Sequence, residues 1–434
     1  MDVKGISLIL AMALLLAVAP MGALAEEIAA IELDLAQDLD AVDDAIELPG
    51  LELDVPDPVS EAVSTPRDET TENAVAIDKA NFPDKVFREY VKENFDTDGR
   101  GRLSKAEINA VKEINVNGKG IASLKGIERF VNLKRLKCEF NELKTLDISK
   151  NRKLEEVDCF RCGLTRLDVS KNVNLIDLDC GGNKLKTLNV SRNTKLERLS
   201  CASNALTKLD AGKNTKLTDL SCADNKLKTL DVSKCKALTG LDCNSNVLTK
   251  LDVSRNTRLK TLECCWNKLK ELDISRNTKL EMLCCWDNAL TKLDAGKCAR
   301  LKSINCDRNR LKTLKVSKCK ALIILSCGHN ALTRLDVGEC TLLNHLNCCD
   351  NRLIELTLGS KKKMEILYAA GNKLKSIDLS SCPILKLLAN AGPTSTYGDT
   401  VWFEYEDDDD NVYQVNIDET TELTDGTKVL YRGK

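Results

Sequence analysis

The sequence is poor in aromatic residues, in histidine and in net charge, and each shortage excludes a class of protein. Aromatic residues make up only 4% of the 434 residues, so the core must be built from Leu, Val, Ile, Ala and Cys. The 64 basic and 66 acidic side chains leave a formal net charge of -2, which provides no overall basic field for a nucleic-acid partner. His329 and His345 are the only histidines, and they lie among different neighbours. No catalytic set is apparent, and we expect that the protein is not an enzyme.

Long apolar runs are also scarce, apart from one at the N-terminus. Residues 6–18 form an apolar run broken only by Ser7, and Ala23-Leu24-Ala25 has the small-x-small pattern of a signal-peptide cleavage site. A membrane anchor is the alternative, but it needs about 20 apolar residues, and Pro20 and Gly22 interrupt this run. We therefore predict a signal peptide over residues 1–25, cleaved after Ala25. The mature protein is then secreted or held at the cell surface, and no later stretch is long enough to span a membrane.

What is abundant is a repeat of 21 residues. Each unit follows the pattern L-x-x-L-x-C-x-x-N-x-L-x-x-L-D-V-S-x-N-x-x, numbered here from its first Leu as positions 1 to 21, and "LERLSCASNALTKLDAGKNTK" (residues 196–216) is a clear example. Met364 and Leu385 continue the series of first positions without a slip. The first positions before them are Leu133, Leu154, Leu175, Leu196, Leu217, Leu238, Leu259, Leu280, Leu301, Leu322 and Leu343.

This pattern resembles the leucine-rich-repeat family, in particular the short bacterial secreted type with Cys in place of one strand Leu. The resemblance covers residues 114–388, and the irregular first unit, "INVNGKGIASLKGIERFVN", is similar to an internalin-style opening repeat. It implies a solenoid of about 13 coils over residues 114–390 and a protein or glycan ligand. Only this resemblance points to a host as the source of the ligand.

The alternation of side chains supports the same fold without the family name. Positions 4 and 6 point to one side of a strand and positions 3, 5 and 7 to the other, so apolar positions 1, 4, 6, 11, 14 and 16 turn inward. The strands stack into a parallel sheet on one face. Because 21 residues leave little room for a helix, we expect extended or short 3-10 segments opposite, with a second narrow strand at L-D-V. Asn at position 9, and Asn or Cys at position 19, would satisfy buried backbone groups as part of the scaffold.

The 20 cysteines all lie within the repeats, eleven at position 6 and five at position 19. Cβ atoms of in-register neighbouring strands stand about 4.8 Å apart, whereas a disulfide needs about 3.8 Å. Cys159 and Cys162 form the only C-x-x-C pair, and no second pair matches it as a zinc site would require. We therefore expect the repeat cysteines to act as small buried hydrophobes, reduced and inaccessible in the folded protein.

Two segments precede the repeats. Residues 26–76 are rich in acidic residues and proline, which favours a disordered linker over an amphipathic helix. Residues 77–113 predict a helical cap whose loop resembles an EF-hand, with Asp96, Asp98, Ser104 and Glu107 as candidate calcium ligands. Arg100 occupies a ligand position, and residues 104–107 also form a helix capping box, so we expect calcium to bind weakly or not at all.

Residues 391–434 predict a β-rich C-terminal cap. "VWFEYE" and "VYQVNI" flank Asp407-Asp408-Asp409-Asp410-Asn411, a pattern typical of a hairpin with an acidic tip. Its place after the last repeat suits a cap that closes the far end of the core.

The outward strand positions are uneven along the array, which favours a binding module. Trp266 and Trp286 fall at positions 8 and 7 of neighbouring units, and Trp is enriched in binding hot spots. They could instead be copies of one drifted repeat with rings folded over the coil edge. The candidate ligand-binding residues on this face are Trp266, Trp286, His329, His345 and Tyr368. The function indicated is binding, and the resemblance to leucine-rich-repeat proteins implies a protein or glycan ligand, with host adhesion as one form of it. The alternative is a structural, envelope-associated spacer that engages other copies of itself, and the sequence does not specify the oligomeric state.

Overall fold

The computed structural model describes residues 74–397, 399–406, 411–425 and 429–432. The predicted signal peptide and residues 26–73 of the predicted linker lie outside the described residues. The N-terminal cap holds the two expected helices, α3 (Lys85–Phe95) and α4 (Lys105–Ala110), with Phe82 and Phe87 buried in its core. Strands β1 (Val75–Ala76) and β2 (Arg102–Leu103) pair antiparallel beside them. In the described part of the chain, no helix has the length and apolar character that crossing a membrane demands.

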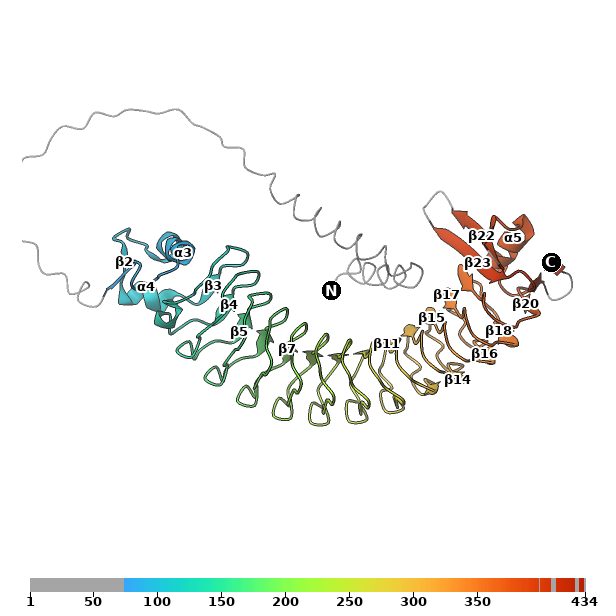
Figure 1. Ribbon diagram of the computed structural model, residues 1–434, viewed down its shortest axis with the longest axis horizontal. Helices are drawn as coiled ribbons and strands as arrows, with labels where there is room; N and C mark the ends of the chain where they lie inside the picture. The colour runs from blue at the N-terminus through green and yellow to red at the C-terminus, as the bar shows by residue number, and fades with distance from the viewer. Residues whose placement is uncertain (1–73, 398, 407–410, 426–428, 433–434) are drawn as a thin grey trace, which may run out of the picture. The chain divides into compact units, whose positions relative to one another are not determined.

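The repeats form the expected solenoid, in which each coil contributes one strand to a 16-stranded sheet along the concave side (Figure 1). Successive repeat strands pair in parallel and in register; Leu199 at position 4, for example, lies beside Leu178 and Leu220. The first pairing, Ile114 with Leu136, spans one residue more than the later repeats, as the irregular opening unit predicts. The repeat strands are β3 (Glu113–Asn115), β4 (Arg135–Lys137), β5 (Glu156–Asp158), β6 (Asp177–Asp179), β7 (Arg198–Ser200), β8 (Asp219–Ser221), β9 (Gly240–Asp242), β10 (Thr261–Glu263), β11 (Met282–Cys284), β13 (Ser303–Asn305), β15 (Ile324–Ser326), β17 (His345–Asn347) and β19 (Ile366–Tyr368).

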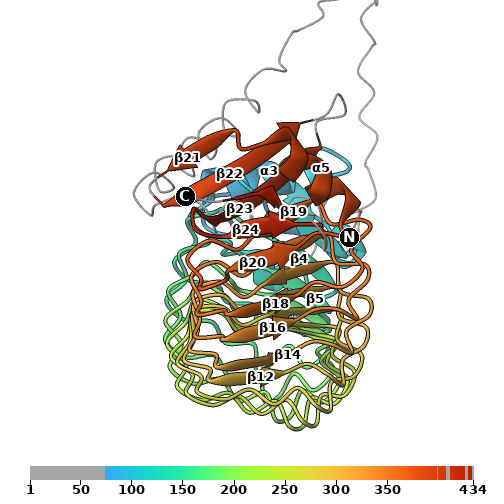
Figure 2. The ribbon, with the colours of Figure 1, turned by 90° about the vertical axis from the view of Figure 1, so that its right-hand side faces the viewer.

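The convex side is mostly extended chain, with one 3-10 helix, η1 (Ile127–Arg129), among the described residues. The narrow second strand forms in the later coils only, at positions 13 to 15, one residue earlier than expected; before it, a single bridge joins Asp210 and Asp231. Figure 2 shows these convex strands stacked one above another. They are β12 (Lys292–Asp294), β14 (Thr313–Lys315), β16 (Arg334–Asp336), β18 (Glu355–Thr357) and β20 (Ser376–Asp378).

The repeat pattern outlasts the repeat structure at the C-terminal end. Leu385 fits the series of first positions, but Pro383 begins a helix, α5 (Pro383–Ala391), in which Leu385 is buried. Proline is favoured in the first turn of a helix. The expected hairpin forms from β22 (Thr400–Glu406) and β23 (Val412–Asp418), and β23 pairs in parallel with β19, where the next repeat strand would lie. The acidic tip 407–410 is outside the described residues. The cap is completed by β21 (Ser395–Tyr397), β24 (Glu422–Thr424) and β25 (Val429–Tyr431).

The side chain of Asn at position 9 joins two neighbouring coils. The side chain of Asn225 donates to the carbonyl oxygens of Cys201, Cys222 and Ala223, and its own oxygen accepts the backbone N–H of Leu206. Both ends of the amide are therefore used, because the inward-turning chain leaves a donor and several acceptors away from water.

Position 19 needs a donor only. The amide of Asn214 donates to Val190 and Asn193, while its oxygen is buried without a hydrogen-bond partner. A thiol can supply a donor without an orphaned acceptor, and Cys235 does so toward the carbonyl of Ala211. Lys361 takes the same position further along, with its ammonium bonded to the carbonyls of Val337 and Leu358. Burial lowers the pKa of the Lys361 amine below its usual value.

Candidate functional site: the concave face

The residue at position 8, where each concave strand has just ended, lies in the left-handed backbone region in every regular coil. This conformation is costly for bulky side chains, typically about 1–2 kcal/mol per residue. Several of these positions nevertheless carry large side chains, and such retained strain is a pointer to function. The position-8 column consists of Phe140, Arg161, Gly182, Ser203, Asp224, Ser245, Trp266, Asp287, Arg308, His329, Asp350 and Gly371.

Trp266 and Trp286, the Trp pair, lie on neighbouring coils as their positions predict. Their ring centroids are 4.0 Å apart with an interplanar angle of 55°, and the backbone N–H of Trp266 donates to the carbonyl of Trp286. Trp266 is 42% exposed despite its size. The neighbouring Cys265 is buried beneath this surface, and its burial, together with contact with the Cys284 thiol, raises its pKa.

A second aromatic group, not singled out from the sequence, occupies the same two positions at the N-terminal end. Phe140 and Phe160 meet edge to face at 5.5 Å, and the Arg161 guanidinium lies 5.5 Å from the Phe160 ring and 5.8 Å from the Phe140 ring. A Cβ on Gly181 would come within 3.1 Å of the Phe160 ring, so a glycine lets the ring lie across the next coil. Phe140, Phe160 and Arg161 together are called the Phe cluster. The sequence signal for this cluster is that its residues occupy positions 7 and 8, the same positions as the two tryptophans.

Four half-buried carboxylates at position 5, the carboxylate column, lie between the two aromatic groups. Asp158 is paired in register with Asp179, and Asp242 with Glu263. Burial raises the pKa of Asp158 to about 6, and it also raises the pKa values of Asp179, Asp242 and Glu263. Perturbed carboxylates of this kind cluster at functional sites.

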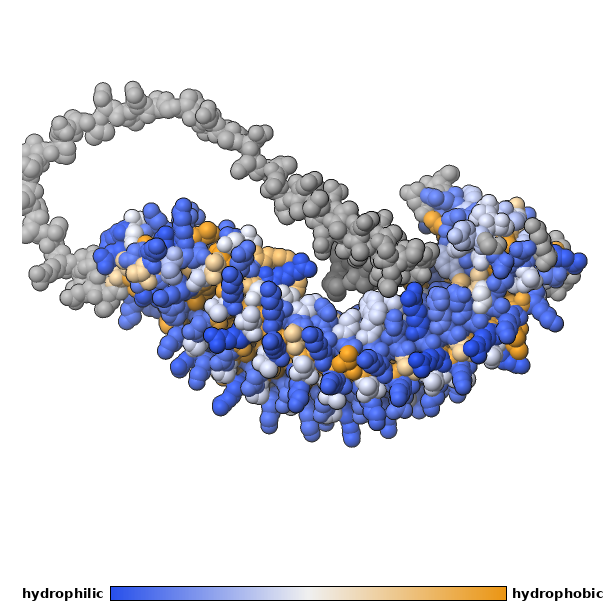
Figure 3. Space-filling model, in the orientation of Figure 1, coloured by the Kyte–Doolittle hydropathy of each residue, from blue (hydrophilic) through white to orange (hydrophobic). Residues whose placement is uncertain are grey.

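Charge is segregated between the two sides of these coils. Over residues 154–287, positions 2, 3, 5, 7 and 8 hold only three cations, whereas the other positions hold twenty cations and six carboxylates. Hydrophilic residues dominate the outer side in Figure 3. The concave face of this stretch is thus acidic although the whole chain is nearly neutral. Its twelve carboxylates are Glu155, Glu156, Asp158, Asp177, Asp179, Glu197, Asp219, Asp224, Asp242, Glu263, Glu281 and Asp287.

The other candidate binding residues lie toward the C-terminal end and apart from the Trp pair. His329 is exposed, with its Nδ1 3.4 Å from a carboxylate oxygen of Asp350. His345 is half-buried on β17, and burial lowers its pKa. Tyr368 packs edge to face on Trp402 at 5.7 Å, and its hydroxyl is hydrogen-bonded to Gln414. The Tyr368 side chain is therefore engaged with the C-terminal cap.

The EF-hand-like loop brings three of its four candidate ligands together. One oxygen each from Asp96, Asp98 and Glu107 lies within 4.8 Å of the others. Ser104 is instead the N-cap of α4 and forms the expected capping box with Glu107.

The same oxygens already have partners within the chain. Burial alone would raise the pKa of Glu107, but hydrogen bonds from Thr97 and Ser104 outweigh it and lower the pKa to about 2. The Arg100 guanidinium lies 3.4 Å from Asp98, so a cation would compete with it for that carboxylate. Weak or no calcium binding stays a prediction, to be tested by calorimetry on residues 26–130.

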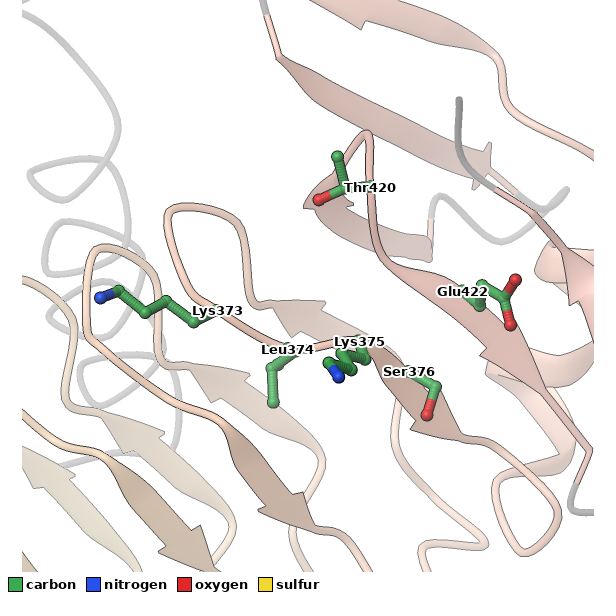
Figure 4. A pocket seen from close by; sticks show the side chains of 6 residues that line it. All are labelled: Lys373, Leu374, Lys375, Ser376, Thr420 and Glu422. Carbon is green, nitrogen blue, oxygen red and sulfur yellow. The ribbon is translucent and has the colours of Figure 1, made fainter.

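A shallow pocket of about 510 Å³ beside β20 and β24 is a weaker candidate. Figure 4 shows that its lining side chains, Lys373, Leu374, Lys375, Ser376, Thr420 and Glu422, point in different directions. They do not converge on a common point as a small-molecule site requires.

Comparisons with known proteins agree with the repeat architecture. Neither protein-family models nor curated proteins give a match. Among solved structures, the functional domain of InlJ from Listeria monocytogenes, described as including a cysteine ladder, is 31% identical, with a TM-score of 0.63 over 72% of this chain and 75% of that one. The internalin InlF from the same organism is 21% identical, with a TM-score of 0.62 over 73% of this chain and 96% of its own.

A more distant solenoid shares the fold alone. In the Toll–Spatzle complex of Drosophila the matching chain is 19% identical, with a TM-score of 0.53 over 67% of this chain and 46% of that one. The cysteine ladder of InlJ has its counterpart here in the buried position-6 thiols. The repeat, the ladder and the identity to InlJ together place the chain in the internalin-type family of leucine-rich-repeat proteins.

Proposed function

We propose that the protein is an exported bacterial binding module whose concave face holds a protein or glycan ligand. The observation that carries this is the Trp pair, with Trp266 exposed and held in a left-handed backbone conformation. Leaving indole in water and straining the backbone both cost free energy. A ligand that covers the pair would recover part of that cost, since buried aromatic anchors dominate binding energies.

Export and an absence of catalysis are parts of the same proposal. The signal-peptide pattern over residues 1–25 supports export, and kinship with internalins is consistent with it. The Toll–Spatzle complex gives an example of this fold with a protein partner. Adhesion to a host is one form that such binding can take.

The test is capture of a partner with the mature chain, residues 26–434, from surface or host extracts. Trp266→Ala combined with Trp286→Ala should leave the Tm nearly unchanged and weaken the captured partner by about 2 kcal/mol or more. Tyr405→Ala is the matched control, because Tyr405 is 57% exposed but lies on the C-terminal cap. A double variant that unfolds, or that binds as well as the control, would show that both tryptophans are structural residues and do not contribute to binding.

The second candidate function is a self-assembling spacer. Segregated charge favours it, because the Lys-rich outer side of one copy complements the acidic concave face of another. Sedimentation at low and high salt measures it. Concentration-dependent oligomers that salt dissociates would favour the spacer over the binding module.

A further inference from the structure

The carboxylate column is an unfavourable arrangement in the isolated protein. Asp158 lies opposite Asp179 and Asp242 opposite Glu263 on adjacent parallel strands. Like charges directly opposite each other in a sheet are destabilising, and burial adds a desolvation cost to each charge. Within the column, the hydroxyl of Ser221 donates to Asp242 at 2.9 Å and the amide of Asn244 to Glu263 at 3.2 Å. No cation of the described residues forms an ion pair with any of these four carboxylates. Lys137 is the register partner of Asp158 on β4 and its charge favours the ionised form of that carboxylate, but its ammonium is paired with Glu156.

The aromatic groups mark the two ends of this acidic stretch. Phe160 and Trp266 are five coils apart, which corresponds to about 24 Å at the usual strand spacing. Between them, position 7 carries a small residue on three successive coils, starting with Gly181, which lies beneath the Phe160 ring. Ala202 and Ala223 continue the row. A ligand backbone can therefore approach the sheet closely between two apolar anchors.

From this arrangement we propose that the concave face between the Phe cluster and the Trp pair binds a Lys- and Arg-rich segment of a partner protein. The proposal rests on the proposed function and adds the chemistry of the partner. Cations laid along the carboxylate column would relieve its repulsion, and apolar side chains about 24 Å apart would reach the two aromatic groups. That distance corresponds to about 16 residues of α-helix.

Charge favours a basic protein segment over two other possible ligands, the N-terminal segment of this chain and a neutral glycan. Residues 26–74 of the chain itself hold sixteen acidic residues against one basic residue, Arg67, so this segment has the same sign as the face. A neutral glycan could stack on the tryptophans but would leave the carboxylate column unpaired. Complementary charge also sets the orientation and the rate of association.

The experiment uses a synthetic peptide of about 16 residues with Leu near each end and Lys between, and the same peptide with Glu in place of Lys. Binding to the mature chain is measured by calorimetry at two salt concentrations. The test variant is Asp179→Asn, Asp242→Asn and Glu263→Gln combined. The control, Asp210→Asn, Asp231→Asn and Asp252→Asn, removes the same charge at position 15 on the other side, where the Asn oxygen can still accept the local turn hydrogen bond.

The wild-type chain is expected to bind the Lys peptide in a salt-sensitive way and not the Glu peptide. The concave variant should weaken binding at least tenfold, and the control less than twofold. Equal losses in both variants, or no loss in the concave one, would overturn the proposal. So would oligomers of the wild-type chain that the concave variant abolishes, because the face would then belong to a second copy.

The Trp-pair variant and the concave carboxylate variant test the proposed function and the basic segment separately. A captured partner that needs the Trp pair but binds the concave variant normally would leave the proposed function standing and refute the basic segment. A partner that ignores the Trp pair would instead refute the proposed function.

Discussion

At the scale of single residues, the buried Asn residues at positions 9 and 19 look alike in the sequence but form different hydrogen bonds. Asn225 at position 9 uses both ends of its amide, whereas Asn214 at position 19 uses only its donor. The difference explains why Cys and Lys replace Asn at position 19 in some coils. It also explains a local distortion: where Cys162 replaces Asn at position 9, Lys144 on the preceding coil has a left-handed backbone found at this repeat position nowhere else in the described residues.

A pair of matched substitutions tests this distinction. Asn214→Cys should change the free energy of unfolding by less than about 1 kcal/mol, because a thiol still donates to the buried carbonyls. Asn225→Cys should cost about 1–3 kcal/mol, because the N–H of Leu206 loses its acceptor. Urea denaturation of both variants measures the difference, and equal losses would show that the acceptor is unimportant.

Asp158 makes the free energy of unfolding fall as pH rises, whereas a carboxylate that stabilises the fold when ionised makes it increase. Its folded pKa of about 6 lies above the unfolded value near 4, so the folded state binds more protons between these pH values. The free energy of unfolding contributed by this group is therefore highest below pH 4 and falls as pH rises to 6.

Asp158→Asn should remove this dependence and raise the Tm at pH 7. Because the side chain is half exposed, the gain in free energy of unfolding should stay below about 1 kcal/mol. Thermal denaturation of both proteins at pH 4 and pH 7 is the measurement. A variant less stable than the wild-type chain at pH 7 would contradict the assignment.

At the scale of secondary-structure elements, the concave strand and the turn after it have separate requirements. The strand needs an inward Leu and Cys, while the turn needs a left-handed residue at position 8. Trp266→Gly should therefore be more stable than Trp266→Ala by about 1 kcal/mol, because only glycine adopts this conformation without strain. The two free energies of unfolding decide it; an Ala variant as stable as the Gly variant would mean that the turn is not strained.

Periodicity predicted the strands, their register and the hairpin of the C-terminal cap, because those follow from local alternation. It did not predict α5, since Leu385 keeps the repeat spacing while Pro383 changes the backbone. The sequence does not predict the Phe cluster, because a Phe at position 8 indicates no contact until the turn brings Phe140 onto Phe160 and Arg161. The Trp pair was recognisable because Trp is rare in the chain. Raised carboxylate pKa values depend on burial, which the sequence pattern does not quantify.

At the scale of the whole molecule, the thiols form a continuous internal ladder. All 20 cysteines are free in the structure, and burial raises the pKa values of the position-6 thiols from Cys159 to Cys348. Because only the thiolate reacts readily, native alkylation at pH 8 should label Cys284, which is not fully buried, in preference to Cys349, whose pKa is raised to about 12 by burial. Mass spectrometry before and after denaturation measures this. Extensive disulfides in fresh protein would contradict the geometric argument against them.

The hydrogen bonds of each position-9 Asn reach only the neighbouring coils, so each coil adds the same fixed length to the array. Deleting one whole unit, residues 196–216, should leave every remaining coil bonded as before while shortening the distance between the Phe cluster and the Trp pair by one division, about 4.8 Å. A ligand that contacts both the Phe cluster and the Trp pair would lose affinity for the shortened chain, whereas one that contacts only one of them would bind with unchanged affinity. The length of the partner can thus be measured by counting repeats.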